Sequence, residues 1–141
     1  MTYEPLGKNR ILVDTDVVSY IFRGDTRADY FRPYLLHRTL AVSFMTVAEL
    51  YYGAYKAGWG TNRVARLENH LRNYTVVPYD FRVCQQWARV RAQRERIGHQ
   101  ITVADAWHAA CALTHECAFA TNNGKDFQNI EGLVLIYPGL S

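Results

Sequence analysis

Apolar and polar positions follow one another along the chain in a way that predicts strands and helices in turn. The run Ile11-Leu12-Val13 is continuous and apolar, which is typical of a strand covered on both faces in a parallel sheet. We predict one strand near residues 10–14. Further short strands are predicted at residues 40–44, 75–78, 118–121 and 133–136.

Apolar residues at helical spacing fill the segments between these strands. We predict helices near residues 16–23, 26–38, 46–58, 61–73, 80–97 and 102–113. Pro33 lies inside the second helix and is expected to kink or split it. The helix over 80–97 has one apolar stripe, made of Val83, Trp87, Val90 and Ile97. The helix that follows Thr102 is apolar almost all round, so we expect it to be buried.

The alternation of strands and helices predicts the fold class. We expect a single three-layer α/β/α domain over residues 1–141, with a mostly parallel central sheet. No apolar run approaches the roughly 18 residues that a membrane helix needs, and no secretory signal precedes the first strand. The three cysteines, Cys84, Cys111 and Cys117, follow no pattern and suit reduced, mostly buried thiols. These features predict a cytoplasmic protein without a membrane partner.

The net charge of +3 arises from sixteen Lys and Arg against thirteen Asp and Glu. This mild excess permits an anionic partner such as nucleic acid and does not require one. Arg82, Arg89 and Arg96 are seven residues apart on a predicted helix. The stripe they form could contact RNA phosphates, although a solvated helix face explains it equally well.

Three carboxylates fall at junctions between predicted elements. Asp14 directly follows the first strand, whereas Glu49 and Asp105 each stand three residues after a threonine at a predicted helix start. In a doubly wound sheet the carboxyl ends of the strands converge on one edge, where ligands bind. We therefore expect the three acids to meet there.

Each of these acids also has a purely structural interpretation. Asp14 or Asp16 could serve only as a helix cap. Glu49 and Asp105 both fit a capping box, with Thr46 and Thr102 respectively.

Clustered carboxylates without a nearby Lys repel each other, and a divalent cation would remove that cost. Oxygen ligands favour Mg²⁺ or Mn²⁺ over Zn²⁺, and His99, His108 and His115 lack a zinc pattern. We interpret His108 and His115 as core or interface residues. A metal in an acid cluster polarises a phosphoryl oxygen and activates water, which indicates hydrolysis of phosphate esters.

With these features the chain resembles the PIN-domain ribonucleases of the VapC type, the toxins of bacterial toxin–antitoxin pairs. The matching segments are residues 11–16, 46–50, 102–110 and 120–123. The resemblance implies a PIN-like domain with Mg²⁺- or Mn²⁺-dependent endoribonuclease activity on structured RNA of the tRNA or ribosomal RNA class. It also implies a homodimer that a cognate antitoxin protein holds inactive.

The resemblance assigns the metal site to three acids: Asp14, Glu49 and Asp105. Thr121 would bond a ligand or the phosphate. Asn123 stands where the family often has a fourth acid, which leaves a second metal in question. Asp126 is close by in sequence and either replaces that acid or faces solvent.

Two other functions fit parts of the same sequence. The run Asp14-Thr15-Asp16-Val17-Val18 resembles the nucleophile motif of haloacid-dehalogenase-type phosphatases, in which Asp14 would form an aspartyl-phosphate. That class needs a later Lys, and only Lys56 and Lys125 follow the motif. The other alternative is a non-catalytic RNA- or protein-binding domain whose site has decayed at Asn123.

Overall fold

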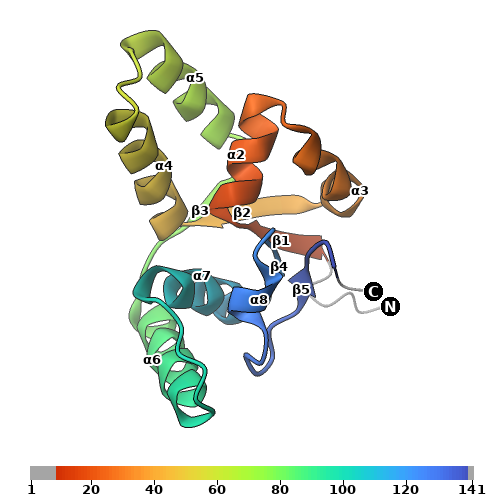
Figure 1. The fold of residues 1–141 in the computed structure, drawn as a ribbon, viewed down its shortest axis with the longest axis vertical. Helices are drawn as coiled ribbons and strands as arrows, with labels where there is room; N and C mark the ends of the chain where they lie inside the picture. Colours follow the sequence, from red (N-terminus) through yellow and green to blue (C-terminus); the bar gives the residue numbers. More distant parts are fainter. Residues whose placement is uncertain (1–8, 140–141) are drawn as a thin grey trace.

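The sheet has five strands and is parallel throughout (Figure 1). The computed structural model describes residues 9–139. The strands are β1 (Arg10–Val13), β2 (Thr39–Ser43), β3 (Thr75–Val77), β4 (Ala118–Ala120) and β5 (Leu135–Ile136). Their order across the sheet is β3-β2-β1-β4-β5. The predicted parallel sheet is therefore confirmed, and β1 lies at its centre.

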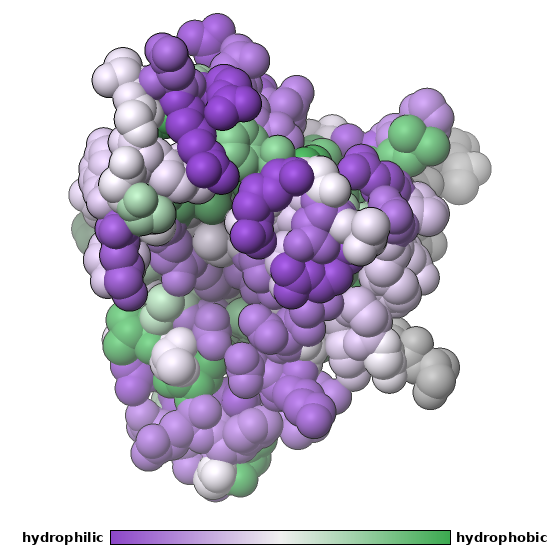
Figure 2. Space-filling model, turned by 45° about the horizontal axis from the view of Figure 1, so that its top comes forward, coloured by the Kyte–Doolittle hydropathy of each residue, from purple (hydrophilic) through white to green (hydrophobic). Residues whose placement is uncertain are grey.

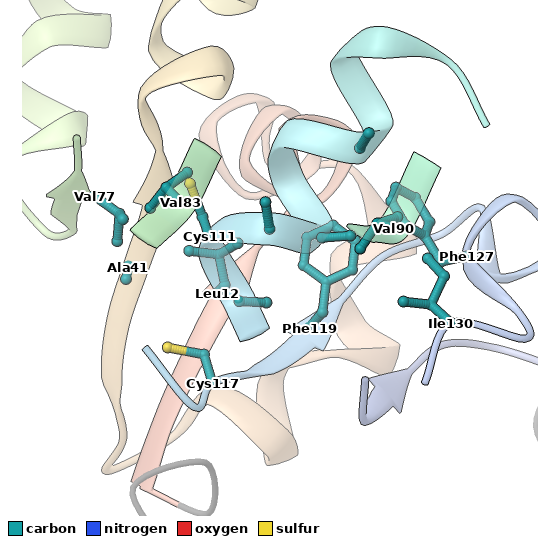
Figure 3. Packing of buried hydrophobic residues seen from close by; sticks show 14 of the residues in the cluster. Leu12, Ala41, Val77, Val83, Val90, Cys111, Cys117, Phe119, Phe127 and Ile130 are labelled. Carbon is teal, nitrogen blue, oxygen red and sulfur yellow. The ribbon is translucent and has the colours of Figure 1, made fainter. Parts of the chain in front are cut away.

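Strand β1 is buried on both faces because its side chains alternate between two cores. Leu12 contributes to a core that also holds Phe119, and Figure 3 shows these two residues among their neighbours. Ile11 and Val13 contribute to the core on the other face, together with Val42. Three consecutive apolar residues are thus fully enclosed, as their unbroken run predicted.

Helices cover both faces of the sheet and give the predicted three layers. One face carries α2 (Thr15–Arg23), η1 (Thr26–Tyr30), α3 (Arg32–Leu35), α4 (Phe44–Lys56) and α5 (Thr61–Leu71), drawn above the sheet in Figure 1. The opposite face carries α6 (Phe81–Arg96), α7 (Val103–Thr114) and α8 (Gly124–Phe127). In helix α7, six of the twelve residues are buried and five more are half-buried, in line with the predicted buried helix.

Two predicted helices differ from the observed ones at their boundaries. The segment 26–38 forms the short pieces η1 and α3, with Pro33 in the first turn of α3, because proline has no N–H to continue a helix across that point. Helix α4 begins at Phe44 rather than near Thr46, because the Ser43 hydroxyl accepts from the Thr46 N–H at 3.1 Å. The predicted capping box of Thr46 and Glu49 is therefore wrong, and Glu49 lies in the second turn.

The predicted apolar stripe of α6 is correct at Val83 and Val90, which are buried. It is wrong at Ile97, which is the C-terminal cap of the helix and 51% exposed. A buried Arg94 occupies the inward-facing position one turn earlier. Within residues 9–139, no helix is both long enough and apolar enough to cross a membrane.

A carboxylate cluster at the carboxyl ends of the strands

Asp14 lies where β1 ends and α2 begins, and both of its carboxylate oxygens are held. It caps α2 through Oδ1, which accepts from the Thr15 N–H at 2.7 Å. The Thr121 hydroxyl donates to Oδ2 at 2.7 Å. The Asp14 N–H donates to the Ala120 carbonyl at 2.9 Å, which extends the pairing of β1 with β4. Two neighbouring strands therefore fix the orientation of one buried carboxylate.

Glu49 reaches the same place from the second turn of α4. The Thr15 hydroxyl donates to Glu49 Oε1 at 2.7 Å, and Thr15 Oγ1 lies 2.9 Å from Thr46 Oγ1. His108 Nε2 lies 2.9 Å from the same Glu49 oxygen, and its Nδ1 lies 2.7 Å from Ser43 Oγ. Because a carboxylate only accepts, Nε2 carries the hydrogen. Glu49 is thereby held from two sides.

Asp105 enters the cluster from the first turn of α7. Thr102 caps this helix, and its hydroxyl accepts from the Asp105 N–H at 3.1 Å, as the sequence predicted. Burial raises the pKa of Asp105, and the negative charge of Asp14 raises it further. Two of the three acids predicted to meet, Asp14 and Asp105, are therefore near enough for their charges to interact. His108 follows Asp105 by one turn, and its Nε2 lies 3.8 Å from Asp14 Oδ1.

Asp16 joins the cluster to the segment that follows β4. Its Oδ2 accepts from the Asn122 N–H at 3.1 Å and from the Asn123 side-chain amide at 3.3 Å. The Asn123 N–H donates to Thr121 Oγ1 at 3.0 Å. Asn123 therefore contacts the acids as a hydrogen-bond donor, at the position where the resemblance led us to look for a fourth carboxylate.

The protonation equilibria of these groups are shifted by burial and by mutual repulsion. Burial raises the pKa of Asp14, and burial together with Asp14 raises the pKa of Asp16 to about 7. Burial opposes a charge on His108 and on Glu49, but the hydrogen bond between them prevails, so the pKa of His108 is raised and that of Glu49 is lowered. The environment therefore opposes full ionisation of the three aspartates, whereas it favours the charged forms of Glu49 and His108.

The oxygen donors of this cluster suit a hard divalent cation. Within the described residues, no Lys or Arg lies within 4.0 Å of the carboxylates of Asp14, Asp16, Glu49 or Asp105. A bound cation would stabilise the charged forms of these aspartates against both burial and mutual repulsion. As the side chains stand, residues 9–139 contain no group of three or more His, Cys, Asp or Glu close enough to hold an ion. The chemistry of the donors fits a metal, and the side chains would have to draw together around it.

Arg94 supports the same region from inside the molecule. Its Nε donates to the His99 carbonyl at 2.6 Å, and its Nη1 donates to the Asp126 carbonyl at 3.0 Å. These carbonyls belong to the loop before α7 and to α8. The Asp126 side chain is exposed, but its charge contributes to the raised pKa of Asp105. Arg94 therefore links the loop before α7 to α8, and both segments lie near Asp105.

The structure places the five residues that we singled out at the same edge of the sheet. Thr121 bonds Asp14, and Asn123 contacts Asp16. Asp14, Glu49 and Asp105 are not close enough together to hold an ion as they stand, so their role as metal ligands stays a prediction. Two participants were missed. His108 is buried as expected, but it also contacts Glu49 and is not merely a core residue.

Asp16 was considered only as a helix cap. Both missed residues left a trace in the sequence. Asp16 repeats the acid two residues after Asp14, and His108 lies three residues after Asp105, hence on the same helix face.

The PIN domain family model matches residues 11–133, and the chain accordingly belongs to the PIN-domain family, as the resemblance predicted. Among curated proteins it is similar to Ribonuclease VapC2 of Haemophilus influenzae, with 27% identity over 88% of this chain and 94% of that protein. It is also similar to the tRNA(fMet)-specific endonuclease VapC of Shigella flexneri, with 24% identity over the same shares.

Among solved structures, VapBC2 from Rickettsia felis bound to a promoter DNA fragment has a TM-score of 0.81. The identity is 24%, and the match covers 92% of this chain and 98% of that one. This likeness confirms the fold.

Proposed function

We propose that this protein is a divalent-metal-dependent endoribonuclease of the VapC type that cleaves structured RNA. The observation that carries the proposal is the placement of Asp14, Asp16, Glu49 and Asp105 at one edge of a PIN-domain sheet, where His108 is the one nearby side chain that can carry a positive charge among the described residues. The relatives named ribonuclease and tRNA-specific endonuclease support the reaction and the tRNA class. Ribosomal RNA remains a second candidate substrate.

Asp14, Glu49 and Asp105 are the residues that would hold Mg²⁺ or Mn²⁺. Bound there, the ion would polarise the phosphodiester and activate the attacking water. Thr121 orients Asp14, whereas Thr15 and His108 orient Glu49. Residues that hydrogen-bond metal ligands fix the geometry of those ligands. In other proteins their loss lowers metal affinity or activity by roughly 10–100-fold.

The residues outside the ligand set have narrower roles. Glu49 is the most exposed of the three proposed ligands and the one with a lowered pKa, so it stays charged and could bind the ion directly or act as a base. Asn123 donates a hydrogen bond to Asp16 and supplies no charge. We therefore propose a single metal ion at this site.

We also propose an antitoxin partner and a homodimer. The Rickettsia felis structure is a VapBC2 assembly on promoter DNA, which supports a partner protein that binds this fold. The VapC resemblance supports the dimer. Sedimentation of the purified chain alone and with the product of a neighbouring reading frame measures both.

The decisive experiment incubates the full chain with bulk tRNA and with ribosomal RNA in Mg²⁺, Mn²⁺ or EDTA, and maps the new 5′ ends. We expect cleavage at defined positions in either metal and none in EDTA. Asp14→Asn should abolish cleavage, because the residue loses its charge where the ion is held. Asp29→Asn is the matched control, since Asp29 is an exposed acid paired with Arg32. Cleavage that persists in EDTA would refute the proposal.

The same experiment tests the two alternatives. RNA binding that is equal with and without Mn²⁺, and never leads to a cut, would indicate a non-catalytic binding domain. Covalent phosphorylation of Asp14 would indicate a phosphatase, but family membership argues against it. Neither Lys56 nor Lys125 forms an ion pair with Asp14, although that class requires a lysine at its site.

A further inference from the structure

A hollow of about 450 Å³ opens at the far end of α2 from the carboxylate cluster. Its lining is Phe22, Arg23, Arg63 and Arg66, from the last turn of α2 and the first half of α5. Figure 1 shows these two helices side by side on the same face of the sheet. In Figure 2, which turns this part forward, hydrophilic side chains dominate the surface above the sheet. Three guanidinium groups therefore face one small concavity.

None of the three arginines of the hollow forms an ion pair within 4.0 Å among residues 9–139, although Asp25 is near enough to Arg23 for their charges to interact. The Arg–carboxylate ion pairs of that part of the chain join other residues: Arg27–Asp25, Arg32–Asp29, Arg82–Asp80 and Arg91–Glu95. Exposed arginines that converge without a carboxylate repel each other. A bound anion would remove that repulsion.

Neighbouring aromatic rings hold part of the hollow in place. The Arg63 guanidinium lies 4.0 Å from the centre of the Trp59 ring. The other neighbour of Trp59 is Phe22, with ring centroids 5.9 Å apart and planes 29° apart. Arg23 Nε donates to the Ser19 carbonyl at 3.4 Å. Two of the three cations are therefore partly oriented before any ligand arrives, which lowers the entropy cost of binding.

We propose that this hollow binds a backbone phosphate of the RNA strand whose cleavage site lies at the carboxylate cluster. The inference rests on the proposed ribonuclease function and adds a second contact to the same substrate. Arg23 follows Asp16 by seven residues on one helix, which places the two sites about 10 Å apart along the axis. A strand that runs along α2 could touch both.

RNA fits this hollow better than an acidic protein segment for two reasons. The carboxylate cluster repels a polyanion, so affinity for RNA must come from cations within reach of it. In addition, all three cations are arginines, whose planar forks match phosphate oxygens in pairs. The stripe of Arg82, Arg89 and Arg96 offers no such convergence, because its members are two helical turns apart and Arg82 is paired with Asp80.

The test uses Asp14→Asn protein as the background, so that RNA is bound without being cut. The probe is fluorescent bulk tRNA, and its anisotropy gives the Kd at several salt concentrations. We expect Arg63→Gln with Arg66→Gln to raise the Kd by on the order of tenfold. The slope of log K against log salt should fall by about 1–2, since each phosphate contact contributes roughly 0.7–0.9.

The matched control is Arg89→Gln with Arg96→Gln, which removes the same charge from an exposed face of α6. We expect it to change Kd and slope far less. Arg66→Gln alone serves if the double variant does not fold, which circular dichroism reports. An unchanged Kd and slope in the hollow variants would overturn the inference, even if wild-type protein cleaves RNA in Mn²⁺.

Two further outcomes distinguish a failure of this inference from a failure of the proposed ribonuclease function. If RNA binding is unchanged but the hollow variants lose the co-expressed antitoxin, the hollow is a protein-docking site and the inference is wrong. If wild-type protein neither binds nor cuts RNA under any metal condition, both the proposed function and this inference are wrong.

Discussion

Two buried charged centres lie beside α7, and their charges are balanced in different ways. Arg94 is 1% exposed and meets two backbone carbonyls, of His99 and Asp126. The cluster around Asp14 gathers several acids, and burial, with a smaller contribution from mutual repulsion, raises the aspartate pKa values. A buried charge that is hydrogen-bonded by its neighbours stabilises the fold. A cluster of acids with raised pKa values is instead typical of a site that binds a ligand. The following three predictions test this difference, from the largest expected effect to the smallest.

Removal of the satisfied charge should destabilise the fold most. Arg94→Met keeps much of the side-chain length but leaves the His99 and Asp126 carbonyls without their donor. Each unsatisfied buried group costs about 1–3 kcal/mol, so we expect the free energy of unfolding to fall by roughly 2–5 kcal/mol in urea denaturation. Arg91→Met on the same helix is the control, because its pair with Glu95 is partly exposed and worth at most about 1 kcal/mol. Equal losses in the two variants would remove the distinction.

Disruption of the unbalanced centre should affect activity more than stability. His108→Leu removes the group that orients Glu49, so we expect RNA cleavage to fall by roughly 10–100-fold. This range corresponds to about 1.4–2.7 kcal/mol. Half-maximal cleavage should also require more Mn²⁺. His70→Leu is the matched control, since His70 bonds Tyr74 away from the cluster. A loss of stability without a change in the Mn²⁺ requirement would make His108 a packing residue only.

The smallest effect concerns stability against pH in the absence of metal. The raised pKa values of Asp14, Asp16 and Asp105 stabilise the fold at acidic pH, and this contribution is lost as pH rises, through about pH 7 for Asp16. The raised pKa of His108 acts in the same direction, whereas the lowered pKa of Glu49 adds stability above its ordinary value of 4.5. Between pH 5 and 8 we therefore expect a net decline on the order of 1 kcal/mol.

A divalent cation should cancel this decline, because it binds the deprotonated carboxylates and so replaces the protons. Thermal unfolding at pH 5 and pH 8, with and without Mn²⁺, measures the effect. Asp16→Asn should flatten the profile without metal. A profile that rises with pH in metal-free buffer would show that the acids do not repel each other in the folded chain.

The fold could be predicted because its main cause is local. The unbroken apolar run at Ile11–Val13 and the helical spacing after each strand depend only on nearby residues. The buried α7 was predicted for the same reason. The common location of Asp14 and Glu49 could be predicted because the carboxyl ends of parallel strands must share one edge.

The remaining features depend on residues distant in sequence. Ser43 rather than Thr46 caps α4 because β2 ends at Ser43, and the end of β2 depends on its pairing with neighbouring strands. The burial of the Arg94 side chain depends on the carbonyls of His99 and Asp126, which only the assembled fold brings near it. The bond between His108 and Glu49 spans 59 residues, and no local pattern contains it. The arginine hollow likewise needs α2 and α5 to lie side by side.

The central position of β1 has a consequence for the order of events during synthesis. Ala120 at the end of its neighbour β4 and the following Thr121 fix the Asp14 backbone and side chain, yet this segment is among the last to leave the ribosome. Until then Asp14 lacks the contacts from Ala120 and Thr121, although Thr15 and His108, which hold Glu49, have already been synthesised. If the proposed activity is correct, the site becomes complete only after β4 has paired with β1.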